Sequence, residues 1–100
     1  MPSPEYRLVL SPLAEADIEN ILRYTGETWG EAQLLIYRDK LNEALQTLRR
    51  DPLIGHTSPE LPDTHRLYLA GAHVIVYRVR EHLVSVMRIL HQRMSLGRHV

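Results

Sequence analysis

The sequence predicts one small α+β domain in which an N-terminal helical hairpin packs on a twisted antiparallel sheet, in the order β-α-α-β-β-β. Two segments with helical periodicity lie in the first half of the chain, and three short strand-like segments follow in the second half. The 100 residues are enough for one hydrophobic core. A hydrophobic content of 44% with 24% charged residues is typical of a folded globular protein.

The first predicted elements are a short strand and a helix. Residues 6–10 form a β-prone run and predict a strand. Ser11 and Pro12 predict the start of a helix, because serine is a favoured N-cap residue and proline is tolerated at the first helical position. Apolar residues at steps of three and four from Ala14 onward predict one buried face, and the helix is expected to end near residues 26–28.

The second predicted helix runs from about residue 31 to residue 49. Apolar residues recur along one of its faces: Leu34, Tyr37, Leu41, Leu45 and Leu48. Further apolar residues broaden this stripe, so that it could contact both a partner helix and a sheet. Pro52 ends the helix, and the short link between the two helices favours an antiparallel hairpin.

A loop and three strands are predicted to follow. Residues 51–64 contain three prolines and a glycine, which indicate a surface loop. The predicted strands are 65–69, 73–79 and 83–90, joined by tight turns. The last two are apolar on both faces, which is typical of central strands. The expected core includes Tyr37, Leu41, Leu45, Ile75 and Met87.

Charge is distributed unevenly along a chain whose formal net charge is zero. The second half has all six histidines and a net charge of +2, and no acid follows Glu81. Net neutrality argues against simple polyanion binding and draws attention to the basic tail, residues 91–100. The absence of cysteine excludes disulfides and thiol chemistry. Neither a signal-peptide pattern nor a long apolar run is present, so we expect a cytoplasmic protein without a membrane span.

The sequence predicts no cofactor, no metal and no catalytic residue of a familiar type. The glycine-rich nucleotide motifs, the zinc-protease motif and the serine-hydrolase motif are all absent. The six histidines are spaced eight or nine residues apart, whereas zinc sites commonly begin with two close ligands.

Several polar residues of the predicted sheet and tail remain as candidates: Arg66, His73, Tyr77, Arg78, Arg88, His91 and Arg93. One interpretation is phosphodiester cleavage at a ribose 2′-OH, which requires a base, an acid and cations around the phosphorus. The other is structural: the arginines pair with helix carboxylates, and the histidine and tyrosine fill sheet positions. The residues alone leave both interpretations open.

Five segments stand out in order along the chain: Leu10-Ser11-x-x-Ala14-x-x-Asp17-Ile18-x-x-Ile21, Trp29-Gly30-x-x-Gln33-x-x-x-Tyr37-x-x-x-Leu41, Asp51-Pro52-x-x-Gly55, Arg66 with His73-x-Ile75-x-Tyr77-Arg78, and Arg88-Ile89-Leu90-His91-x-Arg93-Met94. Together they resemble the ParE toxins, within the RelE/ParE superfamily of bacterial type II toxin–antitoxin systems. One departure is Ser95, which stands where the family commonly has an aspartate.

The resemblance implies a toxin that inhibits DNA gyrase, traps it on cleaved DNA and blocks replication, with a role in plasmid or chromosome maintenance. It also implies a ParD-like antitoxin that wraps and neutralises the toxin in a hetero-oligomeric complex. The basic end suggests the residues that contact the target: Arg88, His91, Arg93 and Arg98. The broad apolar stripe of the second helix suggests the residues that contact the antitoxin: Leu34, Leu35, Tyr37 and Arg38.

Two alternatives belong to the same superfamily. RelE-like toxins are ribosome-dependent mRNA endonucleases that resemble this fold but carry cations in the loop and strand after the second helix, and a tyrosine near the C-terminus. Here residues 51–64 contain no lysine or arginine, and residues 91–100 contain no tyrosine, which favours gyrase inhibition. The other alternative is a relative that has lost toxicity and only binds its antitoxin.

Overall fold

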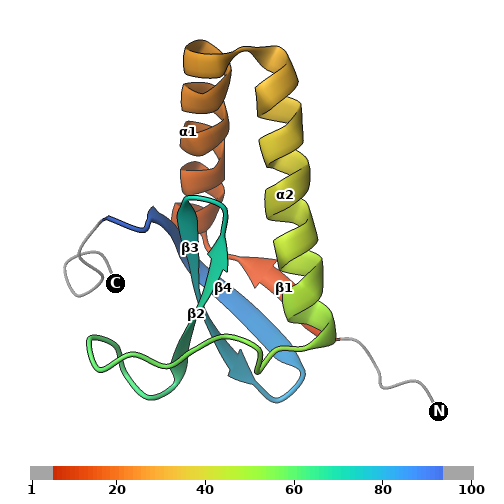
Figure 1. Ribbon diagram of the computed structural model, residues 1–100. Coiled ribbons are helices and arrows are strands. Elements are labelled where there is room, and N and C mark those ends of the chain that lie inside the picture. Colours follow the sequence, from red (N-terminus) through yellow and green to blue (C-terminus); the bar gives the residue numbers. More distant parts are fainter. Residues whose placement is uncertain (1–5, 94–100) are drawn as a thin grey trace.

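The structure is a computed structural model, and it describes residues 6–93. Six elements follow one another along the chain (Figure 1): β1 (Arg7–Leu10), α1 (Pro12–Trp29), α2 (Glu31–Arg50), β2 (His65–Ala70), β3 (His73–Arg80) and β4 (Leu83–His91). The predicted α+β class and the order β-α-α-β-β-β are confirmed. Within the described residues, no helix is long and apolar enough to cross a membrane.

The four strands form one sheet in the order β1-β4-β3-β2. Strands β2, β3 and β4 are antiparallel neighbours, as predicted, but β1 pairs with β4 in parallel, so the expectation of a wholly antiparallel sheet is wrong at this edge. The helical hairpin explains the difference. It returns the chain to the beginning of β1, where the backbone N–H of Tyr6 donates to the carbonyl of Arg49 at 3.1 Å. The two reversals after β2 then make β4 run in the direction of β1.

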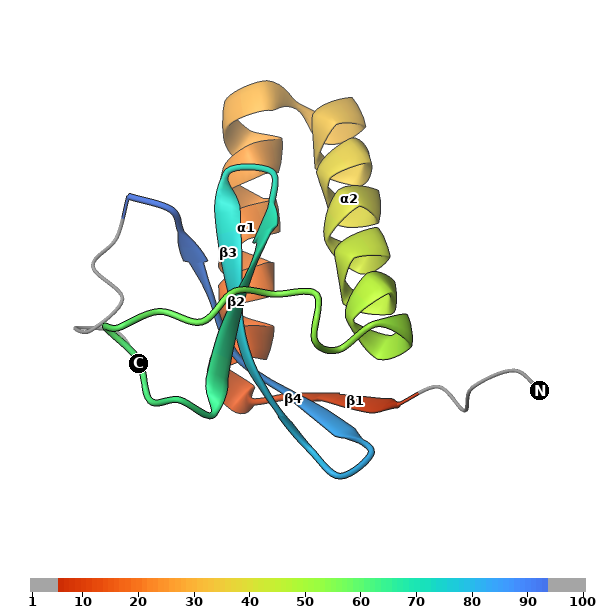
Figure 2. The same cartoon turned by 60° about the horizontal axis from the view of Figure 1, so that its bottom comes forward.

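The helical hairpin covers one face of the sheet, and its tip extends beyond the β2–β3 turn (Figure 1). In the turned view, β1 lies across the lower ends of both helices and is steeply inclined to β3, which shows the strong twist of the sheet (Figure 2). Gly30 joins the helices with a φ of 95°, a backbone conformation that favours glycine. Ser11 caps α1 as predicted, since its hydroxyl accepts from the N–H of Ala14 at 3.0 Å.

The central strands are buried on both faces. The larger core lies between the sheet and the helices and includes Leu41, Leu45 and Ile75, as expected. A smaller core lies on the opposite face, where Leu61 of the 51–64 loop packs with residues of β3 and β4. Tyr37 is only half-buried and packs at the margin of the larger core.

Met87 is the one expected core residue that belongs to neither cluster. It is half-buried at a β-bulge, where Val76 pairs with Arg88 but the next residue, Tyr77, pairs with Val86. Met87 is therefore the extra residue of β4 and leaves the regular alternation of faces. Its carbonyl oxygen accepts a hydrogen bond from the hydroxyl of Ser11 at 2.7 Å, which ties the bulge to the start of α1.

Candidate partner-binding site

The first polar constellation lies where β4 extends past the end of β1. The carboxylate of Asp17 accepts hydrogen bonds from Nε and Nη2 of Arg88 at 2.9 and 3.0 Å, and from the backbone N–H of Ile89 at 2.9 Å. The hydrogen bond with Asp17 is also the main reason that the pKa of Arg88 is raised. Asp17 thus pairs with an arginine and satisfies a strand edge that has no neighbouring strand there.

The second constellation holds the 51–64 loop. The buried hydroxyl of Tyr77 donates to the carbonyl of Pro52 at 2.6 Å and accepts from the N–H of Gly55 at 3.0 Å. Nη1 of Arg66 donates to the carbonyl of Gly55 at 2.8 Å. Both side chains therefore have structural contacts with the loop. Arg78 is exposed, lies on the opposite face of the sheet from Tyr77, and lines a hollow of about 340 Å³ beside the bulge.

The third constellation continues the helix-facing side of the sheet beyond the apolar core. His73 and His91 are directly opposite each other on β3 and β4, and their rings meet edge to face with centroids 5.4 Å apart. The hydroxyl of Tyr37 lies 2.5 Å from Nδ1 of His73 and accepts from the N–H of Ala72 at 3.1 Å. A side chain of α2 therefore fixes both the β2–β3 turn and the orientation of one imidazole.

Burial affects the protonation of this constellation. It raises the pKa of Tyr37, which keeps the hydroxyl protonated and able to donate. It also lowers the pKa of His73, and the neighbouring His91 lowers it further, while Asp17 opposes this change. His73 is consequently neutral at pH 7. Nδ1 of His91 accepts from the backbone N–H of Arg93 at 3.2 Å, so the ring hydrogen of His91 lies on Nε2.

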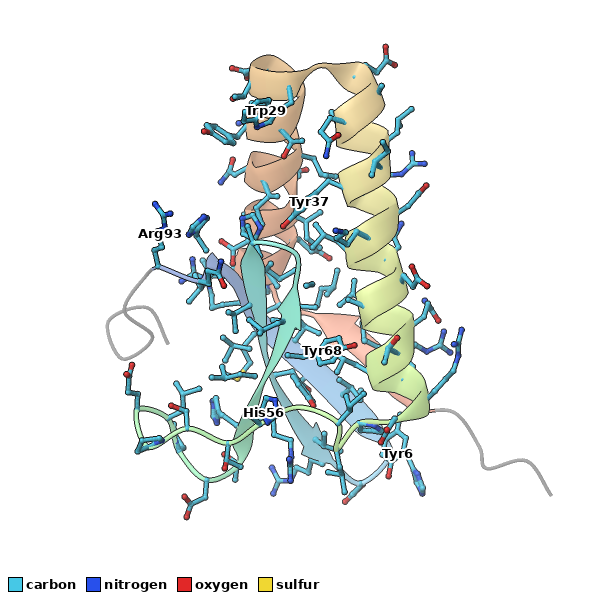
Figure 3. The ribbon with its side chains drawn as sticks, viewed as in Figure 1. Tyr6, Trp29, Tyr37, His56, Tyr68 and Arg93 are labelled. Atoms are coloured by element: carbon cyan, nitrogen blue, oxygen red, sulfur yellow. The ribbon has the colours of Figure 1, made fainter. Side chains whose placement is uncertain are left out.

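These residues line a hollow of about 470 Å³ at the point where the helical hairpin rises above the sheet. We call it the notch, and its lining residues come from α1, α2 and the sheet: Tyr24, Thr25, Trp29, Gln33, Tyr37, Ala72, His73 and His91. Figure 3 shows Trp29 near the tip of the hairpin and Tyr37 above the β2–β3 turn. A smaller hollow of about 210 Å³ shares the two histidines and continues toward Asp17 and Arg88.

The predicted target-binding residues lie in different environments. Arg88 is paired with Asp17, and its side chain is only 21% exposed. His91 is half-buried in the notch, whereas Arg93 is exposed just past β4. Arg98, like most of the predicted basic tail, lies outside the described residues. The structure therefore brings Arg88 and His91 together beside one hollow and leaves Arg93 accessible next to them.

The predicted antitoxin-binding residues divide into two pairs. Leu35 and Arg38 are exposed on α2, and Ile36 beside them is 57% exposed. Leu34 and Tyr37 are half-buried and take part in internal contacts. Leu34 packs so closely on Gly26 of α1 that a Cβ there would lie 2.8 Å from its Cδ1. These two residues hold the hairpin and the β2–β3 turn in place.

Among residues 6–93, no group of three or more histidine, aspartate or glutamate side chains is arranged to hold a metal ion. The arrangement instead combines an apolar wall, exposed aromatic rings and a few hydrogen-bonding groups. That composition is typical of sites that receive a ligand or a side chain of a partner.

Comparison with known proteins identifies the family. Residues 8–96 match the family model described as "ParE toxin of type II toxin-antitoxin system, parDE". The chain belongs to the ParE toxin family. Among its relatives are Toxin ParE1 of Mycobacterium tuberculosis, 37% identical over 94% of this chain and 97% of that protein, and Toxin ParE1 of Caulobacter vibrioides, 32% identical over 91% and 94%.

Solved structures agree on the fold of this ParE-family chain. The chromosomal ParDE system from P. aeruginosa contains a chain that superposes with a TM-score of 0.75 at 19% identity, covering 89% of this chain and 98% of that one. A chain of the toxin–antitoxin complex RelBE2 from Mycobacterium tuberculosis superposes with a TM-score of 0.61 at 16% identity, covering 89% and 100%. At these identities the likeness concerns the fold alone.

Sequence reasoning singled out most residues of the notch without bringing them together. Tyr37, His73 and His91 were all candidates, but on separate segments and for different roles. Trp29 appeared only as the first residue of one of the five segments that resemble the family, and Tyr24 was not singled out. The available signal was the position of the single tryptophan at the tip of a hairpin, where no core can cover it.

Proposed function

We propose that this ParE-family protein is a single-domain cytoplasmic toxin that inhibits DNA gyrase and is neutralised by a ParD-like antitoxin. The observation that carries the proposal is the family match across residues 8–96, with relatives at 32–37% identity over almost their whole length. Family membership supplies the expected target, while the physical features of the chain support a protein that binds macromolecules without a cofactor.

The internal contacts of the polar residues argue against RNA cleavage. Arg66 donates to a loop carbonyl, the hydroxyl of Tyr77 is buried, and Arg88 is paired with Asp17. Arginines held by these internal contacts are poorly placed to stabilise the charge on a phosphate. Such electrostatic stabilisation is usually the largest catalytic contribution in phosphoryl chemistry. The structural interpretation of these residues is therefore the better supported one.

Two surfaces would serve the two partners. The exposed part of the α2 stripe, with Leu35, Ile36 and Arg38, is proposed to meet the antitoxin, because large exposed apolar side chains on a small domain indicate an interaction surface. The basic end, with Arg93 and the predicted contribution of Arg98, is proposed to meet gyrase or the DNA that gyrase holds.

The test compares purified protein in two parallel assays: gyrase supercoiling with detection of cleaved DNA, and cleavage of ribosome-bound mRNA. We expect loss of supercoiling with accumulation of cleaved DNA, intact mRNA, and restoration of gyrase activity by the antitoxin encoded beside the gene. Cleaved mRNA with normal gyrase activity would support the RelE-like alternative. Activity in neither assay, with tight antitoxin binding, would support a relative that has lost toxicity.

A further inference from the structure

The notch has an exposed aromatic rim. Trp29 is 70% exposed and Tyr24 is 66% exposed, although both line the same hollow. Tryptophan and tyrosine are the residue types that most often dominate binding energy at protein interfaces. Figure 3 shows Trp29 on α1 near the tip of the hairpin, well above the apolar core. The fold therefore makes little use of these two rings.

The inner end of the notch supplies hydrogen-bond donors. Nδ1 of His91 is occupied by the N–H of Arg93, and Nδ1 of His73 faces the hydroxyl of Tyr37. The ring hydrogen of His91 therefore lies on Nε2, whereas the tautomer of His73 depends on whether the hydroxyl of Tyr37 donates to it or to the carbonyl of Ala70, 3.3 Å away. An Nε2–H donor with an exposed arginine nearby is suited to an acceptor that carries negative charge, such as a carboxylate.

The open rim distinguishes between classes of occupant. Pockets for free small molecules enclose most of the ligand surface, and a hollow walled by two largely exposed rings cannot do so. Nucleic acid is disfavoured because it would bring a run of phosphates past Glu27 and Glu31, which are exposed and flank Trp29 in the sequence, whereas a protein segment can bring a single carboxylate. A protein segment can fill the hollow with one side chain and make further contacts outside it.

We propose that the notch anchors a protein segment, which inserts one aromatic or large aliphatic side chain beside Trp29 and Tyr37 and places a neighbouring carboxylate on the Nε2 donor of His91. The proposal rests on the proposed function only in naming the antitoxin as the protein that supplies the segment. The notch and the α2 surface proposed for the antitoxin lie on one helix, since Gln33 and Tyr37 of α2 line the notch while Leu35 and Arg38 are exposed beside them in the sequence. Its occupant would also cover His91, so an antitoxin anchored there would exclude a target that needs this residue.

Matched peptides test the chemistry of the site. The probe is the blocked dipeptide N-acetyl-aspartyl-phenylalanyl amide, and its controls replace aspartyl by asparaginyl or phenylalanyl by alanyl. Binding to the full chain is followed by NMR, because the single tryptophan gives one indole N–H signal on the rim of the notch. We expect the indole of Trp29 and the amides of Ala72, His73 and His91 to shift, with about tenfold weaker binding for each control peptide, the effect of one lost charge-assisted or apolar contact.

Two substitutions at one position separate the hydrogen bond from the shape of the imidazole. His91→Asn keeps an acceptor in place of Nδ1 but removes the Nε2 donor, so the preference for the aspartyl over the asparaginyl peptide should disappear. His91→Gln places an amide N–H near Nε2 and should retain part of that preference. His82→Asn is the matched control, because His82 lies in the β3–β4 turn at the far end of the sheet and contacts Tyr6. Trp29→Ala, at an exposed position, should weaken the binding of every peptide that carries phenylalanine.

Each result bears on the notch independently of gyrase. Equal affinity for aspartyl and asparaginyl peptides would overturn the carboxylate contact. Chemical-shift changes confined to residues outside the notch, or no changes at the highest soluble peptide concentration, would overturn the site. Peptide binding by a protein without effect on gyrase would leave the notch in place and remove the proposed function. In the opposite case, the protein binds no peptide, and Trp29→Ala and His91→Asn leave gyrase inhibition and antitoxin rescue unchanged. That result would leave the proposed function in place and exclude the notch as a binding site.

Discussion

At the scale of single residues, the carboxylate of Asp17 joins α1 to β4. A carboxylate in the first turns of a helix commonly interacts with the helix dipole. The structure instead directs that of Asp17 across to β4, where one carboxylate joins the guanidinium of Arg88 to the backbone of Ile89. Helix periodicity cannot reveal such a role, because it depends on where β1 ends relative to β4.

Replacement of Asp17 is expected to be costly. Asp17→Ala would leave the largely buried guanidinium of Arg88 and the N–H of Ile89 without their acceptor, so the free energy of unfolding should fall by about 2–4 kcal/mol. Asp39→Ala is the control, because the Asp39–Arg38 pair is 72% and 50% exposed and should contribute less than about 0.5 kcal/mol. Urea denaturation of both variants measures the difference. Equal stabilities would show that the Asp17 contact contributes little.

Two histidines link stability to pH in a definite direction. Burial lowers the pKa of both His73 and His65 from the ordinary value of 6.5, and Arg78 lowers that of His65 further. The unfolded chain therefore binds more protons than the folded chain at pH values between each lowered pKa and 6.5. Stability must rise with pH through this window and fall as the pH drops below about 6.5.

The pH prediction can be tested with glutamine variants. The free energy of unfolding of the unaltered protein should decline from pH 7 to pH 5, and the decline should be smaller in His73→Gln and His65→Gln. His56→Gln provides the comparison, because His56 is exposed and pairs with Leu67 through its backbone alone. Urea midpoints measured at several pH values provide the slopes. An identical slope in all four proteins would exclude both buried imidazoles as the cause.

At the scale of elements, the β2–β3 turn is shaped by a contact with α2. Gly71 has a φ of 62°, and a Cβ added there would lie 2.8 Å from the hydroxyl oxygen of Tyr37. The same hydroxyl accepts from the N–H of Ala72. The turn and the helix are thus fitted to each other, and the turn places His73 at the inner end of the notch.

A substitution in this turn should report the fit directly. Gly71→Ala should lower the free energy of unfolding by about 2–3 kcal/mol, of which about 1 kcal/mol comes from the left-handed backbone and the rest from the clash with Tyr37. In a Tyr37→Ala background only the backbone part should remain. The double-mutant cycle isolates the clash. Additive effects in that cycle would mean that the turn moves away from the helix at no cost.

Element boundaries were well predicted where local chemistry specifies them. Ser11-Pro12, Pro52 and the glycines at the turns mark their elements through caps and forbidden hydrogen bonds, which depend only on neighbouring residues. The parallel pairing of β1 was missed because it depends on contacts between segments more than seventy residues apart, and the bulge at Met87 was missed because apolar residues continue on both sides of it in β4. Alternating apolar residues specify a strand but neither its neighbour nor a break in its register.

At the scale of the whole molecule, the candidate site lies where three remote segments meet. The α+β class follows from patterns within each half of the chain, so it was predictable. The notch is formed by α1, α2 and the ends of β3 and β4, and no spacing rule connects its residues. The sequence resemblance correctly predicted the ParE family. Only the structure shows that Tyr37 and His91 line the same hollow.

The basic end of the molecule gives the last prediction. Arg93→Ala combined with Arg98→Ala should leave the melting temperature unchanged, because Arg93 is exposed past the end of β4, and should reduce gyrase inhibition more than about tenfold through the loss of charge-assisted contacts. Arg98 lies outside the described residues, so Arg93→Ala and Arg98→Ala are also measured separately to find the contribution of each arginine. If DNA phosphates are the contact, inhibition by the unaltered protein should also weaken steeply as salt rises.

A charge-matched variant provides the control for that experiment. Arg7→Ala with Arg80→Ala removes the same positive charge from exposed positions around a separate hollow beside the β3–β4 turn. If gyrase responds only to net charge, both double variants will lose inhibition equally. If the basic end contacts the target, only the Arg93 and Arg98 variant will lose it, along with growth arrest in cells. Full inhibition in that variant would exclude the basic end and direct attention to the notch and the outer face of α2, where Tyr24, Trp29, Leu35 and Ile36 are exposed.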